Sequence, residues 1–342
     1  MFVLQSAVVK GRGGIATAVA HYERMFRAVG VRSAVLFSGP SIDALREQGV
    51  DVIAASKLLT SPIAAALPLL PSLRREVLAR AAGAPIVAIV HSDLTLPALQ
   101  RLFPEARFVT PCHSDKFKHK KAADLVVTLN AAQHEAARAA LTRPRIAQLG
   151  NPYVAAPPPP LREDGAPRLN FVARFIPTKD PQALLRAAAL MSPPPPLRFF
   201  GDGELAGDLR AAAQSAGLAV EFAGWRSAPF ADFHRNDILV LPSHWEGLPY
   251  LLQEALDHGV PTIASDIPGS RTALGDGAYG ALFPLGDDAL LARTAAEALA
   301  NLDALRDRAE KGRAALRERY GAEAFWRALS AELQQVGERS HV

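Results

Sequence analysis

The sequence predicts an α/β protein with two domains, each built around a parallel β-sheet. The chain has 342 residues, about the length of two domains of roughly 150 residues each. It is 49% hydrophobic and 21% charged, an ordinary globular mixture that excludes disorder, collagen and coiled coil. Short β-branched or aromatic runs alternate with longer runs of Ala, Leu and Arg, as in parallel sheets covered by helices on both faces.

Each expected strand is an apolar run bounded by polar, Gly or Pro residues. In the first part these runs are Phe2–Val8, Ser33–Phe37, Val50–Ile53, Pro85–Val90, Arg107–Pro111, Leu125–Leu129 and Ile146–Leu149, with helices between them that include Ile15–Val29 and Leu69–Ala82. In the second part they are Leu169–Ala173, Leu197–Phe200, Val220–Ala223, Ile238–Pro242, Pro261–Ser265 and Ala281–Phe283.

The domain boundary is expected between Pro152 and Gly165, where a proline run and a charged run can continue neither a helix nor a central strand. We therefore expect an N-terminal domain at 1–152 and a C-terminal domain at 153–318. A last helical pattern, Ala322 to Val336, has no following strand, so residues 319–342 are expected to pack back across the first domain. Open α/β sheets bind ligands at the carboxyl ends of their strands, which predicts a site in a cleft between the domains.

Composition suggests a reducing compartment and an anionic partner. The single cysteine, Cys112, excludes an intramolecular disulfide. The start of the chain lacks a basic leader, and its apolar run is interrupted at Gln5 and Ser6, so we expect no signal peptide and a cytoplasmic location. No membrane span is expected, because the apolar window Leu58–Leu73 is short and broken by prolines.

Charge differs between the two parts of the chain. Residues 1–152 carry 19 Lys and Arg against 10 Asp and Glu, a net charge of +9, whereas residues 153–342 carry 19 against 24, a net charge of −5. The basic part favours an anionic lipid or a phosphorylated acceptor, since no zinc spacing or aromatic RNA-binding pattern supports nucleic acid.

The segment from Asp237 to Asp266 is the most informative, because it reads as strand, loop, helix, loop and strand. Glu246 and Glu254 form an E-x7-E pattern around Gly-Leu-Pro. Pro249 suits the first helical position, and backbone N–H groups of Gly247 and Leu248 would then offer a site for phosphate or sugar oxygens. If the whole span were helical, the glutamates would lie about 12 Å apart along the axis. The alternative is that Glu246 merely offsets the helix dipole and that Glu254 is a solvated helix residue.

Two further turns follow expected strands of the second domain. Arg174 and Lys179 lie in the run ARFIPTK, where two cations could clamp a diphosphate; the alternative is an ordinary surface loop. Gly201 begins the turn Gly-Asp-Gly-Glu after Leu197–Phe200, and its glycines permit close backbone approach. A dinucleotide-binding alternative, with Glu221 as the ribose acid, has misspaced glycines.

The first domain offers three candidate features at the carboxyl ends of strands. Gly13 and Gly14 open a helix after the first strand, and His113 follows the strand Arg107–Pro111. A lysine cluster lies just beyond it and is either a solvated loop or an anion patch for acceptor phosphates or lipid headgroups. Its members are Lys116, Lys118, Lys120 and Lys121. Lys57, Arg74, Arg75 and Arg80 flank the apolar window, which is either core or an interfacial segment.

Taken together, these stretches resemble the retaining GT-B glycosyltransferases of glycosyltransferase family 4. The resemblance rests on the Gly13-Gly14 loop, Gly150-Asn151-Pro152, ARFIPTK, FFGDGEL, the Ser-x-x-Glu-Gly-Leu-Pro start of E-x7-E, and HGVPTIASDIPG. It implies two Rossmann-like domains facing across a cleft, retention of anomeric configuration, and neither metal nor cofactor besides a UDP- or GDP-sugar.

The resemblance also implies roles for particular residues. Arg174 and Lys179 would hold the diphosphate, and Gly201 would lie in the donor site. Glu246 would contact the transferred sugar beside the amides of Gly247 and Leu248, and Glu254 would bind the ribose. His113 would lie near the reacting carbon, and Gly13 and Gly14 near donor phosphate and acceptor. Two positions depart from the pattern, since Ala173 and Asp180 stand where the family usually has glycine.

The function expected from this resemblance is sugar transfer to a lipid-linked or cell-envelope polysaccharide or glycolipid acceptor. The enzyme would be cytoplasmic, or peripheral at the inner face of the cytoplasmic membrane. Two alternatives stay open: a GT-B isomerase or phosphorylase, and a non-catalytic basic lipid-binding module. The sequence does not identify the base, the sugar, the acceptor or the oligomeric state.

Overall fold

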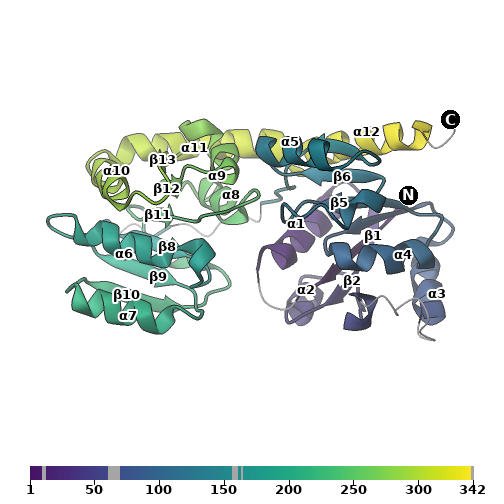
Figure 1. Cartoon of the computed structure of the whole chain (residues 1–342), viewed down its shortest axis with the longest axis horizontal. Coiled ribbons are helices and arrows are strands. Elements are labelled where there is room, and N and C mark those ends of the chain that lie inside the picture. Colours follow the sequence, from purple (N-terminus) through teal and green to yellow (C-terminus); the bar gives the residue numbers. More distant parts are fainter. Residues whose placement is uncertain (10–12, 61–69, 156–160, 163–164, 340–342) are drawn as a thin grey trace. The chain divides into compact units, whose positions relative to one another are not determined.

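The computed structural model describes the chain apart from residues 10–12, 61–69, 156–160, 163–164 and 340–342. It divides into two compact units (Figure 1). Unit 1 comprises Met1–Val154 and Arg319–Val342, and unit 2 comprises Ala155–Glu318. The first division falls two residues beyond the expected Pro152, and the second falls after Glu318.

Unit 1 contains a seven-stranded parallel sheet with the order β3-β2-β1-β4-β5-β6-β7. Its strands are β1 Phe2–Val8, β2 Arg32–Ser38, β3 Val52–Ala54, β4 Ile86–Val90, β5 Arg107–Pro111, β6 Leu125–Thr128 and β7 Arg145–Gln148. Every strand expected in this part is present. The strand order reverses direction between β1 and β4, so the carboxyl ends of these two strands mark a topological switch point, where ligands of such sheets bind.

Helices cover both faces of this sheet. They are α1 Gly14–Ala28, α2 Ile42–Glu47, α3 Leu70–Ala81, α4 Leu96–Leu102, α5 Ala131–Ala140 and α12 Ala322–Arg339. Phe2 and Leu4 of β1 pack with α3, α4 and α5, whereas Val3 packs with α1 and α12. This alternation is the period-two pattern of a strand buried on both faces.

The C-terminal helix α12 is part of the unit 1 core. Its apolar residues Phe325, Leu329, Leu333 and Val336 recur at helical spacing and are each at most 7% exposed. They pack against Tyr22 and Phe26 of α1. Burial of this stripe fixes the end of the chain against the sheet, because each buried large apolar side chain contributes about 1.5–3 kcal/mol.

Unit 2 contains a six-stranded parallel sheet with the order β10-β9-β8-β11-β12-β13. Its strands are β8 Leu169–Val172, β9 Leu197–Phe200, β10 Val220–Gly224, β11 Ile238–Leu241, β12 Thr262–Ser265 and β13 Ala281–Phe283. The expected strands are again present. Here the switch point lies between β8 and β11, so the loops that follow these two strands are the ones that the topology brings together.

The helices of unit 2 are α6 Pro181–Ala189, α7 Ala206–Ser215, α8 Tyr250–Asp257, α9 Pro268–Ala273, α10 Asp288–Ala300 and α11 Leu302–Tyr320. Apolar residues of α6, α7 and α10 pack on one set of strand side chains around Phe171 and Phe199. Helix α11 approaches α8 closely at Gly312, where a Cβ atom would lie 2.7 Å from Leu256. Both domains thus have the layered architecture that the sequence predicts.

Candidate functional site

Two loops of unit 2 meet at the switch point through a pair of predicted site residues. Lys179 lies at the end of the loop after β8, and Glu246 lies in the loop after β11. The Lys179 Nζ atom is 2.5 Å from Glu246 Oε1, and the two side chains are 21% and 10% exposed. A cation and a carboxylate from segments 67 residues apart therefore form a charge-assisted hydrogen bond in a partly desolvated place.

The Glu246 loop is fixed by contacts with three neighbouring segments. The His244 N–H donates to the Thr178 carbonyl at 2.9 Å, which ties this loop to the loop after β8. The Ser265 hydroxyl at the end of β12 donates to the Ser243 carbonyl at 2.5 Å. Gly269 in α9 lies directly against the loop, since a Cβ atom there would be 2.4 Å from the Glu246 carbonyl. The backbone at Glu246 is thereby held in one place.

The loop after β8 rests on the turn that Gly201 begins. The Phe175 N–H donates to the Asp202 carbonyl at 2.8 Å. Gly201 has φ +145°, and a Cβ atom there would lie 1.9 Å from the Ala173 carbonyl. Only glycine fits such an approach. Gly201 thus has a packing role beneath Arg174, and its predicted contact with a donor stays a prediction.

The backbone at Asp180 accounts for one position where the sequence departs from the glycine that is usual in glycosyltransferase family 4. It has left-handed backbone angles, φ 41° and ψ 58°, a conformation that favours glycine and that Asp tolerates. Its carboxylate accepts from the Ala183 N–H at 3.2 Å and so caps helix α6. The same carboxylate lies 3.0 Å from His244 Nε2 and 3.4 Å from Arg186. The extra negative charge is therefore engaged in local contacts.

The other predicted donor residues of unit 2 lie nearby in sequence but differ in setting. Arg174 is exposed, and its guanidinium has no carboxylate partner in the part of the chain that the structure describes. Leu248 is 3% exposed. Glu254 is half-buried within α8. The predicted contacts of Arg174, Gly247, Leu248 and Glu254 with a donor stay predictions.

The span from Glu246 to Glu254 is only partly helical. Helix α8 begins at Tyr250, and Pro249 is its N-cap residue with extended backbone angles. Glu246, Gly247 and Leu248 therefore lie in the preceding loop, and the axial separation calculated for a continuous helix does not apply. The physical reason is that a proline disfavours helical angles in the residue before it.

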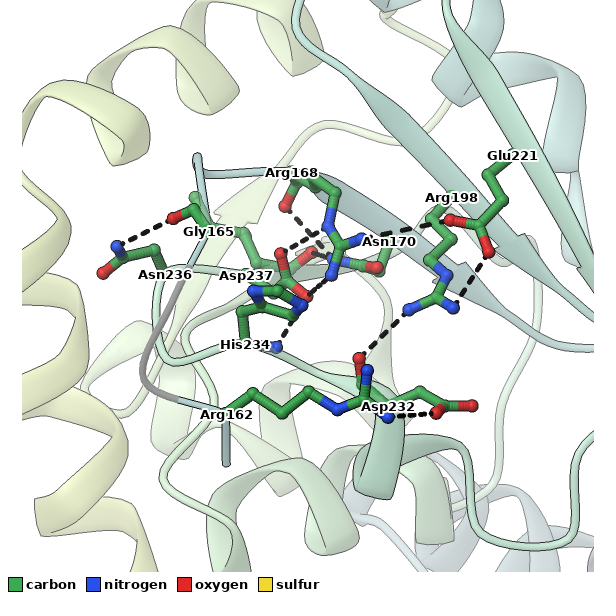
Figure 2. A network of polar contacts seen from close by, with 11 residues as sticks. Arg162, Gly165, Arg168, Asn170, Arg198, Glu221, Asp232, His234, Asn236 and Asp237 are labelled. Atoms are coloured by element: carbon green, nitrogen blue, oxygen red, sulfur yellow. Dashed lines mark hydrogen bonds and ion pairs between the residues drawn. The ribbon is translucent and has the colours of Figure 1, made fainter. Parts of the chain in front are cut away.

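Figure 2 shows a second polar network in unit 2, which includes Arg168, Arg198, Glu221 and Asp237. Fully buried Asp237 precedes β11 and accepts two hydrogen bonds from Arg168, at 3.0 and 2.8 Å. Arg198 of β9 lies 2.9 Å from Glu221. These residues lie near the amino ends of their strands. The network stabilises the sheet, and Glu221 is wrongly placed for the ribose acid of a dinucleotide site, which belongs at a carboxyl end.

In unit 1, His113 lies after β5 and is the outer member of a buried hydrogen-bonded chain. Its Nε2 atom is 2.9 Å from Nδ1 of His91, which directly follows β4. His91 Nε2 is 2.8 Å from the side-chain oxygen of Gln5 in β1. Burial, with a smaller effect of Lys120, lowers the pKa of His113 to about 4, and burial lowers the pKa of His91 well below its usual value. Both imidazoles are therefore neutral at pH 7.

The lysine cluster is not a uniform surface patch. Lys116, Lys118 and Lys121 are exposed, but Lys120 is 1% exposed and forms an ion pair with Asp93. The Lys120 ammonium also donates to the Lys116 carbonyl at 3.1 Å. The prediction that Lys120 faces headgroups or acceptor phosphates is wrong, because a buried charge needs its partner and Asp93 supplies it.

Most of the predicted interfacial segment, residues 61–69, lies outside the described residues. Its described ends join the core of unit 1, since Leu59 is 4% exposed and Leu73 packs against the same cluster. Of the flanking cations, Arg74 lies 3.0 Å from Glu105 and Arg80 lies 2.8 Å from Asp51. These contacts favour the core interpretation of the window ends.

Gly13 and Gly14 begin helix α1 after β1. A Cβ atom at either position would meet nothing within 4 Å, so packing within the described chain does not require glycine at either one. Their predicted contact with donor phosphate and acceptor stays a prediction.

Sequence reasoning missed His91, Gln5, Glu23 and the Lys120–Asp93 ion pair. His91 had a usable signal, because it follows a strand as His113 does. Gln5 had another, since it interrupts an apolar strand and is fully buried. The partnership of these residues depends on the pairing of β1 with β4, which local sequence does not reveal.

No helix within the described ranges is long and apolar enough to cross a bilayer. Across the same ranges, no group of three or more His, Cys, Asp or Glu side chains could hold a metal ion. Metal independence stays a prediction.

Comparison with protein families identifies the domain that carries the Lys179–Glu246 pair. Residues 156–315 match the family described as Glycosyl transferases group 1. The match covers nearly all of unit 2, Ala155–Glu318, and less than half of the whole chain.

Curated relatives match parts of the chain. An Escherichia coli UDP-Gal:alpha-D-GlcNAc-diphosphoundecaprenol alpha-1,3-galactosyltransferase is 32% identical over 125 residues, 34% of this chain and 32% of the relative. The lipopolysaccharide core biosynthesis glycosyltransferase LpsE of Rhizobium meliloti is 30% identical over 163 residues, 47% of each chain. The chain thus spans less than half the length of these curated relatives.

Solved structures match the whole fold. HepE of Anabaena in complex with UDP and glucose superposes with a TM-score of 0.78 at 15% identity, covering 98% of this chain and 100% of that one. The lipopolysaccharide outer core galactosyltransferase WaaB superposes with a TM-score of 0.71 at 19% identity, covering 98% and 99%. The two Rossmann-like α/β domains therefore constitute a GT-B fold.

Proposed function

We propose that the protein is a glycosyltransferase that moves a sugar from a nucleoside-diphosphate sugar to an acceptor. The observation that carries the proposal is the Lys179–Glu246 pair at the switch point of a glycosyltransferase group 1 domain. A cation there suits a diphosphate, and a carboxylate beside it suits the hydroxyls of the sugar attached to that diphosphate.

Each predicted residue has a role in this proposal. Arg174 and Lys179 neutralise the diphosphate in the ground state and as the bond to the sugar breaks, which is the work that a metal ion would otherwise do. Glu246 accepts hydrogen bonds from the sugar, Gly247 and Leu248 present backbone amides, and Glu254 binds the ribose. Gly201 supports the loop that carries Arg174.

The residues of unit 1 belong to the same proposal. His113 contacts the transferred sugar, and Gly13 and Gly14 leave room for donor phosphate and acceptor to approach the backbone. By resemblance to glycosyltransferase family 4, the product keeps the anomeric configuration of the donor and no metal takes part. UDP- and GDP-sugars are the first donors to test.

The proposed acceptor is a lipid-linked or cell-envelope saccharide. Support comes from the names of partial relatives, one acting on a diphosphoundecaprenol-linked sugar and one assigned to lipopolysaccharide core biosynthesis. We further propose a cytoplasmic enzyme that binds an anionic membrane surface through Lys116, Lys118 and Lys121, which are exposed on a basic domain.

The test is a panel of UDP-, GDP- and ADP-sugars with candidate acceptors, read as released nucleoside diphosphate. Wild-type protein should turn over one donor class, and Lys179→Ala should lose most of that rate, while Lys311→Ala serves as an exposed control. The anomeric configuration of the product, read by NMR, tests retention. Equal rates for wild type and Lys179→Ala with every active donor would refute the assignment of the diphosphate site.

The membrane proposal has a separate test. Replacement of Lys116, Lys118 and Lys121 by Gln should reduce binding to vesicles that contain anionic lipid, each lysine contributing about 1 kcal/mol near such a surface. Vesicles of neutral lipid provide the control. Unchanged association with anionic vesicles would contradict the membrane role without affecting the transfer reaction.

A further inference from the structure

Five side chains of unit 1 form one chain of hydrogen bonds that is buried in its middle and ends at His113. At the end opposite His113, the Ser33 hydroxyl donates to Glu23 Oε2 at 2.9 Å, and Gln5 Nε2 donates to Glu23 Oε1 at 2.5 Å. The Gln5 oxygen faces His91 Nε2 at 2.8 Å, and His91 Nδ1 faces His113 Nε2 at 2.9 Å. The chain links α1, β1, β2 and the loops after β4 and β5.

The three middle members of this chain are well shielded from water, whereas Ser33 and His113 are partly exposed. Gln5 is fully buried, His91 is 3% exposed and Glu23 is 6% exposed. The His91 ring also stacks on the His113 ring, with centroids 5.2 Å apart and planes 22° apart, and meets Tyr22 edge-on. Such buried groups must satisfy their donors and acceptors among themselves, so each hydrogen bond constrains the direction of the next.

The Glu23 carboxylate determines which group donates and which accepts in each hydrogen bond of the chain. An ionised Glu23 can only accept, so the Gln5 amide must turn its nitrogen toward Glu23 and its oxygen toward His91. His91 Nε2 must then carry a proton in order to donate to that oxygen. A neutral His91 has its second ring nitrogen, Nδ1, free of a proton, and Nδ1 therefore accepts a proton donated by His113 Nε2.

We propose that Glu23, Gln5 and His91 are positioning residues that hold His113 with its proton on Nε2, so that its Nδ1 atom accepts a hydrogen bond from a hydroxyl of the bound sugar. The identity of the ligand in this inference rests on the proposed function. The donor and acceptor at each hydrogen bond from Glu23 to His113 do not depend on it. Within the described part of the protein, no side chain or backbone group is hydrogen bonded to His113 Nδ1.

The charges around the chain are compatible with this arrangement. Burial raises the pKa of Glu23, whereas its hydrogen bonds from Ser33 and Gln5 and the nearby Arg27 favour the carboxylate, and Asp51 opposes it. Lys120 lies near His113 and disfavours a second proton on that ring, as burial does. A neutral His113 is what the inference needs, because a doubly protonated imidazole could not accept.

The experiment reads the protons directly by ¹⁵N–¹H NMR of full-length protein with labelled histidine at pH 7. In wild type, His113 should carry its proton on Nε2, with coupling across the hydrogen bond to His91 Nδ1. Glu23→Gln conserves size but supplies an amide that can donate as well as accept, which allows the Gln5 amide to turn over. The Nδ1-protonated form of His113 should then become detectable.

Two further variants make the result specific. His91→Phe keeps an aromatic ring between Tyr22 and His113 but removes the acceptor, so the coupling should vanish and both proton positions of His113 should be seen. Ser33→Ala removes a partner of Glu23 without reversing the Gln5 amide, so its His113 spectrum should match wild type. Circular dichroism should establish that all variants are folded.

Transfer kinetics test the second half of the inference. Losing one hydrogen bond of about 0.5–1.5 kcal/mol lowers kcat/KM about 2–10-fold, which is expected for Glu23→Gln and His91→Phe but not for Ser33→Ala. A wild-type His113 protonated on Nδ1, or identical His113 spectra in all four proteins, would overturn the positioning role of Glu23, Gln5 and His91. A wild type that transfers no sugar while the spectra behave as expected would instead overturn the proposed function.

Discussion

Replacing Glu246 by Gln should separate the binding of nucleoside diphosphate from the binding of nucleotide-sugar. The Lys179 Nζ atom lies 2.5 Å from Glu246 Oε1. A diphosphate that uses Lys179 must compete with this carboxylate for the ammonium group. Removing the carboxylate charge therefore frees the cation and, at the same time, removes the acceptor proposed for the sugar hydroxyls.

The burial of the pair sets the size of the effect. Exposed ion pairs contribute about 0–1 kcal/mol, and hydrogen bonds to charged groups about 1.5–3 kcal/mol. With side chains 21% and 10% exposed, this pair should lie between these limits, at about 1–2 kcal/mol or a factor of 5–30. Lys179→Met should weaken nucleoside diphosphate by about this factor, whereas Glu246→Gln should leave its affinity unchanged or raise it.

Isothermal titration calorimetry at fixed salt and pH 7 provides the measurement, after a thermal-shift screen has identified the nucleoside diphosphate that binds. The ratio of nucleotide-sugar affinity to diphosphate affinity should fall in Glu246→Gln and stay constant in the exposed control Lys116→Met. Thermal unfolding should show that each protein is folded at the titration temperature. If Glu246→Gln weakened the diphosphate as much as Lys179→Met, Glu246 would not be the sugar-binding partner of a cation–diphosphate site.

Three further predictions concern stability. Asp237→Ala leaves the Arg168 guanidinium without its main partner, so denaturant unfolding should show a loss of about 3–5 kcal/mol, against less than about 0.5 kcal/mol for the exposed control Asp303→Ala. Gly201→Ala should destabilise strongly because its Cβ would lie 1.9 Å from a carbonyl oxygen, whereas Gly207→Ala meets nothing within 4 Å and should change stability by at most about 1 kcal/mol. Burial, and to a smaller extent Arg24, lowers the pKa of His21 to about 3, so between pH 6.5 and 3 only the unfolded chain binds a proton at this residue. The free energy of unfolding should therefore fall by about 1.4 kcal/mol per pH unit over this range as the pH is lowered. The difference in unfolding free energy between wild type and His21→Gln measures this slope, and a difference that does not change with pH would contradict the prediction.

The fold was largely predictable because its strands are continuous apolar runs between loop residues. Strand β1 begins and ends at the predicted residues, Phe2 and Val8. Strand β5 likewise has its predicted bounds, Arg107 and Pro111. The ends that shifted, such as the start of β3 at Val52, lie where the run is short and its burial uneven. Apolar runs of this kind specify strands because both faces of a parallel sheet are covered.

The sequence predicted the site residues that lie in loops after strands. It did not predict residues whose setting depends on a partner far away in the sequence. Lys179 and Glu246 were both assigned to loops after strands, and the strand order brings these loops together. Lys120 was assigned to the surface because its neighbours in sequence are charged. Its burial is decided by Asp93, 27 residues away, and no local pattern indicates that partner.

Asp180 shows how backbone geometry and chemistry combine at one position. Because the turn after Lys179 requires a left-handed backbone, glycine is the residue that fits without strain, and Asp is among the few others that tolerate it. Its side chain then caps α6 and contacts His244, which itself belongs to the loop that carries Glu246. The substitution therefore adds a side-chain connection between the two loops of the candidate site. The effect of Asp180 on donor binding therefore depends on the groups that its carboxylate contacts, and not on its negative charge alone.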